Sequence, residues 1–403
     1  MHSYYDDDAD QVDWRGIEDA AYFIHDYCVK WGRLGGQAKE KWGCYDEKTE
    51  VLTKEGWKLF KDTNINSDLF ATLTPDHCLE YQKATKYFED PYSGDMYQIT
   101  TRGVDLLVTP NHNLYVSKGD VAGGVGNKHG KTFPYQLQTY ESLFRKPKNF
   151  LKGAKWIGKH VDTIEIPSFH KSWKNCSYST RVLDKPALQL SAKPLLRLLG
   201  WFVAEGCYSH NNTSTFCIHI DEVQELEDLL DRLGIKHARS IRPPFECMLH
   251  IYNIQLHDFF LENCGKLAAN KHVPPFVKDL TPELIEEFLT GLYAGDGHLS
   301  STSHILTTIS KRLADDVLEL LLKVGYCGRV SIRDRTERVS ICEGREIQGN
   351  YPSYEINWLK KIEHRTINSH DTQKQINEKE RLVLYSGKVY CVSVPNKILY
   401  IRR

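Results

Sequence analysis

A nine-residue stretch near the middle of the chain occurs twice and constrains the fold more than any other feature. Residues 198–206 are LLGWFVAEG, and residues 289–297 are LTGLYAGDG. Each copy is largely apolar and ends on one carboxylate, Glu205 or Asp296, followed directly by glycine, which is the pattern of a helix that stops at its C-terminal end. From position 205 to position 296 the offset is 91 residues.

The same offset continues beyond the two stretches, which indicates a duplicated unit. In each copy a β-rich run follows, and then an amphipathic helix that a glycine ends; the runs are 213–220 and 304–309, and the helices are 222–233 and 311–324. Asp221 and Ser310 stand at the expected N-cap positions of these helices. Two copies of one supersecondary unit in a single chain predict a domain with pseudo-twofold symmetry.

The paired carboxylates predict a cation site. Small residues along both helices let the two backbones approach closely, and these are Gly200, Ala204, Gly291, Ala294 and Gly295. Close contact would bring Glu205 and Asp296 together, where two carboxylates repel unless cations lie between them. Mg²⁺ prefers oxygen ligands, and paired metals can activate a water and stabilise the leaving oxygen in phosphodiester cleavage. The alternative is two ordinary core helices whose terminal acids are solvated.

The two stretches resemble the signature helices of LAGLIDADG homing endonucleases, and the resemblance covers residues 191–359. It implies two αββαββα halves whose sheets form a saddle over double-stranded DNA, with Glu205 and Asp296 as Mg²⁺ ligands. The run 271–276, KHVPPF, is similar to the segment between the halves that carries a catalytic lysine in intein-borne members. Lys271 is therefore a candidate for polarising the scissile phosphate or the attacking water, and the alternative is a solvated linker lysine.

Overall charge does not indicate a nucleic-acid partner, but one stretch of the chain does. The 52 Lys and Arg residues nearly balance the 53 Asp and Glu residues, so the formal net charge is −1. Between residues 145 and 185, basic side chains outnumber acidic ones and aromatic residues lie among them, which fits contact with DNA phosphates. The candidates for DNA contact are Lys152, Lys155, Lys159, Lys171, Lys174 and Arg181. The alternative is a solvated linker.

Length and cysteine content bound the class of protein. A chain of 403 residues with 41% hydrophobic residues is long enough for about two or three domains. The 11 cysteines show no CxxC spacing, and they predict a reducing, cytoplasmic location rather than a disulfide scaffold or a zinc site. No apolar run reaches the length of a membrane span, and we expect a monomer without a membrane partner.

Residues 44–144 have the pattern of an all-β region. Short runs separated by turn residues predict strands at 49–53, 56–60, 69–73, 96–101, 104–108 and 114–116. The region begins at Cys44, which follows Gly43. A cysteine in that position, taken alone, is most simply a buried thiol.

Three runs, in this order along the chain, resemble the splicing motifs of inteins. Residues 44–53 are similar to the N-terminal splicing motif, 108–116 (VTPNHNLYV) to the TxxH motif, and 388–401 (KVYCVSVPNKILYI) to the penultimate β motif. In large inteins an endonuclease is inserted between the second motif and the third. The resemblance therefore implies a horseshoe-like Hint splicing domain that is interrupted by an endonuclease.

The resemblance also implies a role for each residue of these motifs. Cys44 would attack the carbonyl of Gly43 and convert the upstream peptide bond into a thioester, with no cofactor. His112 would protonate the departing nitrogen, and Thr109 would hold the carbonyl. Gly43 and Cys44 are then the splice junction, and the residues before them belong to a host protein.

The C-terminal splicing motif departs from the family. Cys391 stands where inteins carry Asp or Cys, but Lys397 stands where many carry histidine. The chain also ends at Arg403, before the terminal His-Asn and the downstream nucleophile of inteins. We therefore expect branch formation and asparagine cyclisation not to occur within this polypeptide.

Together these inferences predict an α+β multidomain protein, a self-splicing intein that carries a site-specific homing endonuclease. The expected parts are a host-protein fragment at 1–43, a Hint splicing domain from 44–144 and 382–403, a basic connector and possible DNA arm at 145–190, and an inserted LAGLIDADG endonuclease at 191–375. Two alternatives stay open. One is an autoprocessing element with an inactive endonuclease, and the other is a DNA-binding module with neither activity.

Overall fold

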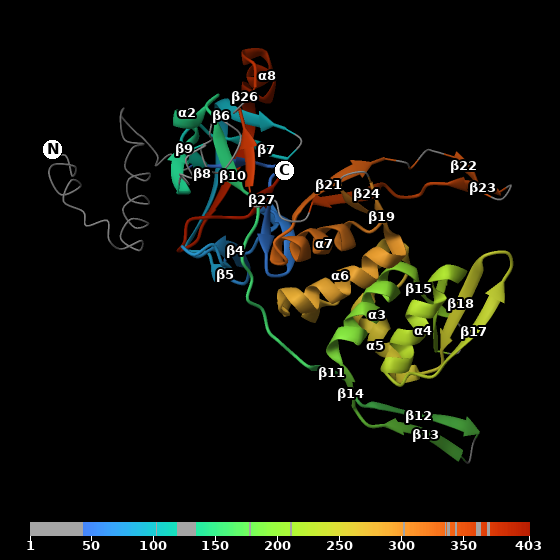
Figure 1. Ribbon diagram of the computed structural model, residues 1–403. Coiled ribbons are helices and arrows are strands. Elements are labelled where there is room, and N and C mark those ends of the chain that lie inside the picture. Colours follow the sequence, from blue (N-terminus) through green and yellow to red (C-terminus); the bar gives the residue numbers. More distant parts are fainter. Residues whose placement is uncertain are drawn as a thin grey trace, which may run out of the picture. The chain divides into compact units, whose positions relative to one another are not determined.

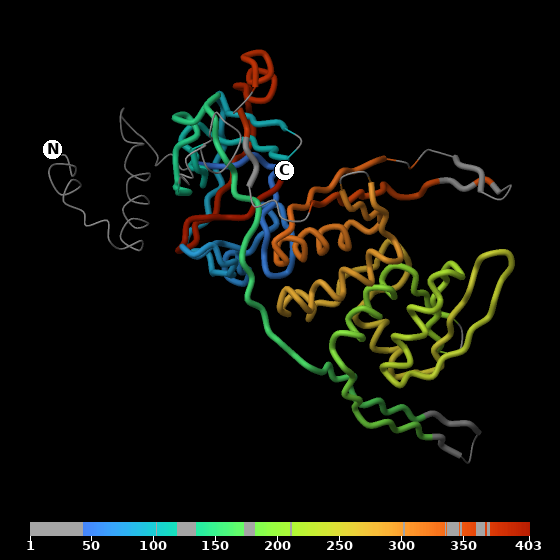
Figure 2. Tube along the Cα trace, viewed as in Figure 1, coloured from blue at the N-terminus to red at the C-terminus, as the bar shows by residue number. Residues whose placement is uncertain are grey.

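The computed structural model describes residues 43–101, 103–118, 134–176, 179–209, 212–300, 303–334, 336, 339–342, 345–359, 364–368 and 371–403. The chain forms two compact units, one from residues up to Ala154 and from residue 362 onward, the other from the residues between them. Figures 1 and 2 trace the chain through both units. Apart from Gly43, the predicted host fragment at 1–43 lies outside the described residues.

A closed barrel of strands forms the centre of the first unit. It joins β1 (Tyr45–Asp46), β26 (Glu380–Ser393), β6 (Lys86–Thr100) and β7 (Asp105–Val108). β6 and β26 pair along their whole length, from Lys86 opposite Ser393 to Ile99 opposite Glu380. Because β1 pairs with both β26 and β7, a strand from the end of the chain lies beside the residues that follow Cys44.

Two further sheets complete the first unit. One contains β2 (Glu50–Thr53), β3 (Gly56–Leu59), β4 (Leu69–Leu73), β5 (Leu79–Lys83) and β27 (Ile401–Arg402), and the other has the order β25 (His364–Ile367), β10 (Lys148–Leu151), β8 (Asn113–Lys118), β9 (Gln136–Thr139). The described part of the unit also includes the short helices α2 (Tyr140–Leu143) and α8 (Gln373–Lys379), so it is mixed rather than all-β. Every strand expected between residues 49 and 116 is present, but β6 begins at Lys86 rather than at residue 96, because β26 pairs with it throughout.

The boundaries between the units differ from those predicted from the sequence. Residues 145–154 belong to the first unit, because β10 pairs with β8 on one side and with β25 on the other. Residues 155–190 belong to the second unit, so the predicted connector is not a separate segment. The second unit ends at residue 361 rather than 375, since α8 packs against β6 and β26.

A buried ion pair joins the two chain segments of the first unit. Lys148 Nζ lies 2.6 Å from a carboxylate oxygen of Glu380, and neither side chain is exposed. Removing one partner leaves the other charge buried without compensation, which typically costs about 3–5 kcal/mol. We expect Glu380→Ala to lower the free energy of unfolding of this unit by an amount in that range, measured by urea denaturation. The matched control is Lys388→Ala, which removes an exposed pair with Glu89 and should cost less than about 1 kcal/mol. Equal losses in the two variants would contradict the expectation.

The second unit contains the same order of elements twice. The first half runs α3 (Ala192–Glu205), β15 (Gly206–Ser209), β16 (Thr213–His219), α4 (Val223–Arg232), β17 (His237–Arg242), β18 (Glu246–Ile251), α5 (Ile254–Cys264). The second half runs α6 (Pro282–Asp296), β19 (Gly297–Leu299), β20 (His304–Thr308), α7 (Lys311–Lys323), β21 (Cys327–Arg333), β24 (Ser353–Leu359). The two sheets have equivalent strand orders, β15-β16-β18-β17 and β19-β20-β24-β21. The predicted αββαββα repeat is thus present in the first half, whereas within the described residues of this unit no helix equivalent to α5 follows β24.

The ends of the repeated helices follow from local chemistry. Gly234 and Gly325 take positive φ angles of 66° and 77° directly after the two amphipathic helices, as the sequence predicts. The Ser310 side chain accepts a hydrogen bond from the Leu313 N–H and caps α7 as expected. Asp221 does not cap α4, however. A short 3₁₀ helix, η3 (Ile220–Glu222), precedes α4, and the capping residue of that turn is His219, because its backbone and side chain exchange hydrogen bonds with the turn.

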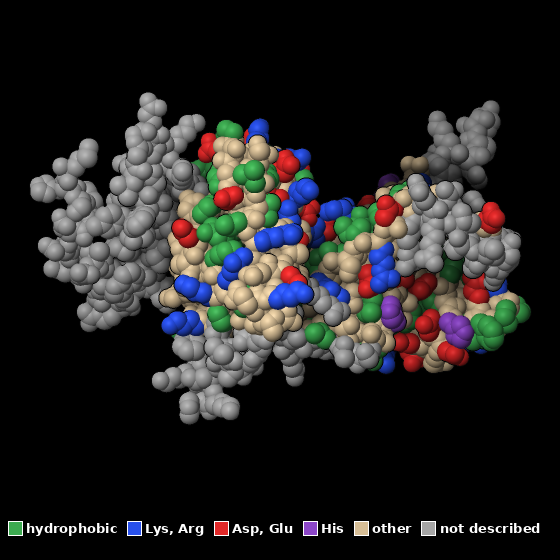
Figure 3. All heavy atoms as spheres, turned by 90° about the horizontal axis from the view of Figure 1, so that it is seen from above, with side chains coloured by type: hydrophobic (Ala, Val, Ile, Leu, Met, Phe, Trp, Pro, Cys, Tyr) green, Lys and Arg blue, Asp and Glu red, His purple; other side chains and the backbone are tan. Residues whose placement is uncertain are grey.

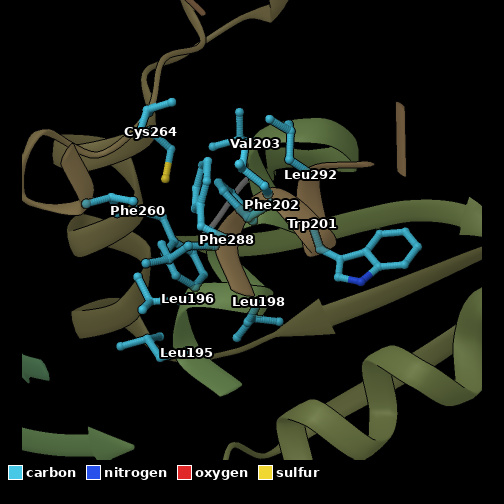
Figure 4. Packing of buried hydrophobic residues seen from close by; sticks show 14 of the residues in the cluster. Leu195, Leu196, Leu198, Trp201, Phe202, Val203, Phe260, Cys264, Phe288 and Leu292 are labelled. Carbon is cyan, nitrogen blue, oxygen red and sulfur yellow. The ribbon is translucent and has the colours of Figure 1, made fainter. Parts of the chain in front are cut away.

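The core of the second unit surrounds α3 and α6. Figure 4 shows side chains of α3, α5 and α6 meeting in this core, and the rings of Phe202 and Phe260 stack with their centroids 4.4 Å apart. The buried cluster extends from Leu195 on α3 to Leu320 on α7, so it is shared by both halves. Burial of this one continuous cluster fixes the two signature helices against each other.

Hairpins extend from the second unit at two places (Figure 1). β11 (Thr163–Ile166) pairs with β14 (Leu188–Ser191), and β12 (Phe169–Cys176) pairs with β13 (Ser179–Lys185) between them. A second hairpin, β22 (Val339–Cys342) with β23 (Arg345–Gln348), is inserted between β21 and β24. None of the helices within the described ranges is long and apolar enough to cross a membrane.

Candidate active sites

The helices α3 and α6 touch through glycines. An added methyl group at Gly200 would lie 2.1 Å from the Phe288 carbonyl oxygen, and one at Gly291 would lie 2.0 Å from the Arg197 carbonyl oxygen. No side chain larger than hydrogen fits at either position without a shift of the backbones. The expected close approach of the two signature helices is therefore present.

The close approach of α3 and α6 predicts how a substitution at their contact changes stability. Gly291→Ala should lower the free energy of unfolding of the second unit by about 1–3 kcal/mol or more, because the new methyl group meets backbone that cannot rotate away. Urea denaturation followed by tryptophan fluorescence measures the effect. Thr290→Ala, at the exposed neighbouring position, is the control and should stay within about 0.5 kcal/mol of the parent. A Gly291→Ala protein as stable as the control would contradict the close packing.

The two helices end on Glu205 and Asp296, which lie together. A methyl group at Gly295, next to Asp296, would lie 3.0 Å from Cγ of Glu205. Burial and the neighbouring charges of Asp296 and Glu222 raise the pKa of Glu205 to about 7, against a smaller opposing effect of Lys271. Burial raises the pKa of Asp296 to about 6, again opposed by Lys271. Two half-buried carboxyl groups that titrate close to neutrality form a place where a proton and a metal cation compete.

The donor set fits a hard cation but does not complete its coordination shell. Among the described residues, no group of three or more His, Cys, Asp or Glu side chains is placed to hold a metal ion. A Mg²⁺ ion between Glu205 and Asp296 would need further oxygen ligands from backbone, water or a bound phosphate. This suits Mg²⁺, which keeps several waters and is commonly held by one or two carboxylates together with substrate phosphates.

Lys271 lies at the end of α3 rather than in a solvated linker. Its Nζ donates to the carbonyl oxygens of Phe202 at 2.7 Å and Gly206 at 2.6 Å, and the residue is 6% exposed. A cation here satisfies the last carbonyls of the helix and interacts favourably with the negative end of its dipole. Burial lowers the pKa of Lys271, against the charges of Cys264, Asp296, Cys207 and Glu205. The structure thus brings Lys271 to the same place as both acids.

Ser310 and Asp316 hold the segment around Lys271, a role that the sequence analysis did not assign to either residue. The Ser310 hydroxyl donates to the Lys271 carbonyl oxygen at 2.7 Å, and the Val273 N–H donates to Asp316 at 3.2 Å. Both come from the α7 end of the second half, whereas the Lys271 side chain reaches the helix of the first half. No sequence signal pointed to this role, because Ser310 was explained fully as an N-cap.

The residues predicted to contact DNA are divided between the two units. Lys155 and Lys159 are exposed on a segment whose backbone is fixed to the second unit, since Lys159 N–H donates to the Asp279 carbonyl and Trp156 Nε1 donates to the Leu280 carbonyl at 2.8 Å. Lys171 is exposed on β12. Lys152 is half-buried in the first unit, and the side chains of Lys174 and Arg181 lie outside the described part of the chain. On the face that Figure 3 presents, Lys and Arg side chains lie in separate places with acidic side chains between them.

In the first unit, the predicted splicing residues meet at the start of β1. The Cys44 N–H donates to Oγ1 of Thr109 at 2.9 Å, and the Thr109 N–H donates to the Cys44 carbonyl at 3.0 Å. A methyl group at Gly43 would lie 2.5 Å from Cα of His112, so only glycine fits there. Two separate motifs predicted these residues, Gly43 with Cys44 and Thr109 with His112. The two pairs are therefore neighbours in the fold.

His112 is deeply buried and electrically neutral at neutral pH. Its ring centroid lies 4.2 Å from that of Tyr45, and neither ring nitrogen has a hydrogen-bonding partner among the described residues. Burial lowers the pKa of His112 to about 4, while the Gly43 carbonyl acts in the opposite direction. The predicted role of His112, protonation of the departing Cys44 nitrogen, would therefore require the neutral imidazole to take up a proton before it donates one.

The remaining predicted splicing residues lie at the other end of the chain. Cys391 is on β26, where its Sγ donates to the Val392 carbonyl at 3.6 Å, and burial raises its pKa to about 12. Burial, with the neighbouring Cys391 and Asp90, raises the pKa of Cys44 well above its usual range. Lys397 lies in a turn after β26, with a positive φ of 61° and an N–H that donates to the Val394 carbonyl. Arg403, which the sequence analysis did not single out, places its Nε 3.0 Å from Asp46.

Residues 283–379, which begin in α6, match the family model of the LAGLIDADG-like domain. Among solved structures, the chain is similar to the homing endonuclease I-DmoI in complex with DNA and Mn, at 15% identity over 41% of this chain and 89% of that one, with a TM-score of 0.30. It is also similar to the N-terminal LAGLIDADG domain of DUF199/WhiA, at 14% identity over 41% of this chain and 74% of that one, with a TM-score of 0.26.

Curated proteins with different names match much of the chain. The DNA-directed RNA polymerase subunit beta C-terminal section of Stigeoclonium helveticum is 24% identical over 90% of this chain and 36% of its own length. The ATP-dependent Clp protease proteolytic subunit of Chlamydomonas moewusii is 25% identical over 72% of this chain and 28% of its own length. The ribonucleoside-diphosphate reductase subunit beta of Aquifex aeolicus is 24% identical over 89% of this chain and 48% of its own length. The chain thus spans between 28% and 48% of the length of these relatives.

Proposed function

We propose that this chain is an intein whose LAGLIDADG-like domain cuts double-stranded DNA at a specific site with the help of Mg²⁺. The observation that carries the nuclease half is the pair Glu205 and Asp296 at the end of two glycine-packed helices, with both pKa values raised toward neutrality. The cation, when bound, would polarise a phosphate oxygen and lower the pKa of an attacking water. Glu205 and Asp296 would hold it, and the Lys271 ammonium beside them would attract the phosphate.

The sheets of the second unit support DNA as the substrate. On the face of the first sheet that points away from its helices, which we name the open face, hydrogen-bonding side chains form a row across four strands. The Thr215 hydroxyl, which is itself buried, shares hydrogen bonds with Ser209 at 3.0 Å and with His250 at 3.1 Å, and His250 shares one with Ser240 at 3.1 Å. Ser209, His250 and Ser240 are the partly or fully exposed members of the row. Such groups match the edges of base pairs, which β-strands can contact in the major groove. Lys155, Lys159 and Lys171 are exposed and would contact phosphates.

The first unit supports an acyl shift at the Gly43–Cys44 bond. In this step His112 takes the thiol proton, Sγ of Cys44 attacks the Gly43 carbonyl carbon, and the carbon–nitrogen bond breaks as the proton passes to the Cys44 nitrogen. The products are a thioester at Gly43 and a free amine at Cys44. Thr109 supports this geometry, because its hydroxyl already accepts from the Cys44 N–H and so fixes the junction.

The relatives support an inserted element. A polymerase subunit, a protease subunit and a reductase subunit are unrelated enzymes by name, yet each matches most of this chain. An intein inserted into different hosts would appear as one segment that unrelated proteins share and that is shorter than each of them. We accordingly propose a host protein upstream of Cys44 and a reducing intracellular compartment, where the Cys44 thiol stays free.

A cleavage selection tests the nuclease. The full chain is incubated with a library of randomised duplex DNA and Mg²⁺, and the new ends are sequenced. Cutting at one extended sequence, abolished by a chelator, is the expected result. Binding to DNA without cutting would favour the DNA-binding module, and release of residues 1–43 by thiol in a chain that never cuts DNA would favour the autoprocessing element with an inactive endonuclease.

The raised pKa values predict how cleavage depends on pH. Protons and Mg²⁺ compete for Glu205 and Asp296, whose pKa values are about 7 and about 6. The Mg²⁺ concentration for half-maximal cleavage should therefore fall as the pH rises from about 6 to about 8, by up to tenfold per pH unit. Initial rates at several Mg²⁺ concentrations measure this. A Mg²⁺ requirement that does not change over this range would show that these carboxyl groups do not hold the metal.

A further inference from the structure

Two thiols lie side by side next to the proposed metal centre. The sulfurs of Cys207 on β15 and Cys217 on β16 are 3.9 Å apart. The strands are antiparallel neighbours in which Cys207 pairs with Thr215, so the two cysteines are diagonal partners across the ladder. Cys207 is exposed and Cys217 is half-buried, which leaves the pair accessible to a small reagent.

The pair is connected directly to residues of the candidate metal site. Cys207 follows Glu205 by two positions, and the carbonyl of the intervening Gly206 accepts the hydrogen bond from Lys271 Nζ at 2.6 Å. Gly206 pairs with Phe216, so Cys217 lies one residue beyond the last paired position, toward Glu205. A movement of β15 against β16 at this point is therefore transmitted to the end of α3.

The side chains alternate along β16 in a way that keeps the thiols out of the core. Phe216 and Ile218 are buried in the cluster around α3. Because neighbouring residues of a strand point to opposite faces, Cys217 lies on the open face, together with Cys207 and Ser209 of β15. This is the face that the proposed function assigns to DNA.

We propose that Cys207 and Cys217 form a disulfide with each other when a disulfide oxidant such as oxidised glutathione is present. This bond displaces Glu205 and slows DNA cleavage. The second part of this proposal rests on the proposed nuclease function. The first part, formation of the bond, does not.

The exchange balances in two steps. Sγ of Cys207, the more exposed of the two thiols, attacks one sulfur of oxidised glutathione, and the first reduced glutathione leaves with the Cys207 proton. The Cys217 sulfur then attacks Sγ of Cys207 in the mixed disulfide and releases the second, so two electrons pass from the protein to the oxidant. Cys217 is the less exposed of the two thiols, which agrees with its acting second.

Closing the bond is expected to move the backbone, because diagonal neighbours in a β-ladder lie about 7–8 Å apart, whereas the Cα atoms of a disulfide are usually about 4.4–6.8 Å apart. The sulfurs are 3.9 Å apart, whereas a disulfide holds them at about 2 Å. The difference has to be taken up partly by β15, whose first residue, Gly206, is tied to Lys271 and follows Glu205 directly. A misplacement of about 1 Å at a catalytic centre can lower the rate by roughly 10²-fold. We expect a loss of that order in the oxidised protein.

The experiment equilibrates the full chain with mixtures of reduced and oxidised glutathione, and it reads out two quantities. Peptide mapping by mass spectrometry under non-reducing conditions detects a linked pair of peptides that contain Cys207 and Cys217. Mg²⁺-dependent DNA cleavage is measured on the same samples, each compared with its own fully reduced form. The expected result is a linked pair that rises with the oxidised fraction, together with a parallel loss of cleavage that a reductant restores.

Variants separate the proposal from its alternatives. Cys207→Ser and Cys217→Ser should each lose the response to oxidised glutathione, whereas Cys327→Ser, which removes another half-buried thiol of the same unit, should keep it. Absence of the linked pair in the parent protein overturns the proposal, and so does a linked pair that leaves cleavage unchanged. A parent protein that cuts DNA in neither state refutes the nuclease function, while the peptide map still decides whether the thiol pair is an oxidation site.

Discussion

Replacing Asp296 with asparagine is expected to abolish DNA cleavage and, at the same time, to stabilise the metal-free protein above neutral pH. The amide cannot bind Mg²⁺ as a carboxylate does, and loss of the metal's charge stabilisation should slow cleavage by roughly 10³-fold or more. The gain in stability follows from the raised pKa values of both acids. A carboxyl group whose folded pKa is raised favours folding at low pH, and this contribution is lost as the pH rises through about 6 to 7. Asparagine has no proton to lose in this pH range, so it does not become charged.

Two measurements on one preparation test both halves of this expectation. Single-turnover cleavage at saturating Mg²⁺ gives the rate, and thermal unfolding with a chelator at about pH 6 and about pH 8 gives the stability. Asp228→Asn, the same substitution at an exposed position on α4, should change neither quantity. Glu205→Gln should behave as Asp296→Asn does. Cleavage that survives in Asp296→Asn would remove Asp296 from the metal site, and a drop in stability above neutral pH would show that the acid is not destabilising in the free protein.

Replacing Cys44 with alanine is expected to abolish thiol-induced release of residues 1–43 completely, because alanine has no nucleophile. In the parent protein, an added thiol such as dithiothreitol should release this segment by exchange with the thioester at Gly43. Burial raises the pKa of Cys44, so the thiolate is a minor form at neutral pH. The rate of release should therefore rise with pH, by up to tenfold per unit, until exchange with the added thiol limits it.

Gel electrophoresis after incubation with thiol at several pH values measures the release, and mass spectrometry identifies the new ends. Cys78→Ala, which removes a half-buried thiol elsewhere in the same unit, should release the segment as the parent does. His112→Ala should release it far more slowly, because the buried imidazole proposed to take up the Cys44 proton is gone. Release from Cys44→Ala at the parent's rate would exclude the acyl shift at this residue.

The signature helices show how far sequence reasoning reached in the second unit. The sequence contains a carboxylate before a helix-ending glycine twice, at one offset. This pattern predicted that α3 and α6 end at Glu205 and Asp296, as they do. The small residues predicted close packing, and the approach at Gly200 and Gly291 confirms it. Such features are local, because helix ends and the size of a side chain depend on a few neighbouring residues.

Lys271 shows where sequence reasoning stopped. The sequence left it between a catalytic and a solvated linker lysine. The fold buries it against the α3 carbonyls and holds its own carbonyl with Ser310, 39 positions away in the chain. The same limit applies to the basic stretch at 145–185, which the sequence treated as one connector. Pairing of β10 with β25, more than 200 positions later, divides it between the two units. Partners that distant leave no periodic signal in either segment.

The splicing residues lie between these cases. Motif order alone selected Gly43, Cys44, Thr109 and His112, but not the protonation state of the histidine. Burial fixes His112 as neutral, and burial is a property of the packed unit. The predicted protonation of the leaving nitrogen by His112 stays a prediction, and burial adds only that the imidazole would first have to accept a proton.

The amino-acid sequence by itself determined the repeat, the ends of its helices, most strands of the first unit and the identity of the paired acids, since each depends on residues a few positions apart. Only the tertiary structure decided which thiols are neighbours, which lysine is buried, where one unit ends, and how strongly each acid holds its proton. Those properties arise when segments far apart in the chain exclude water from one another, and the loss of water sets both the contacts and the charges.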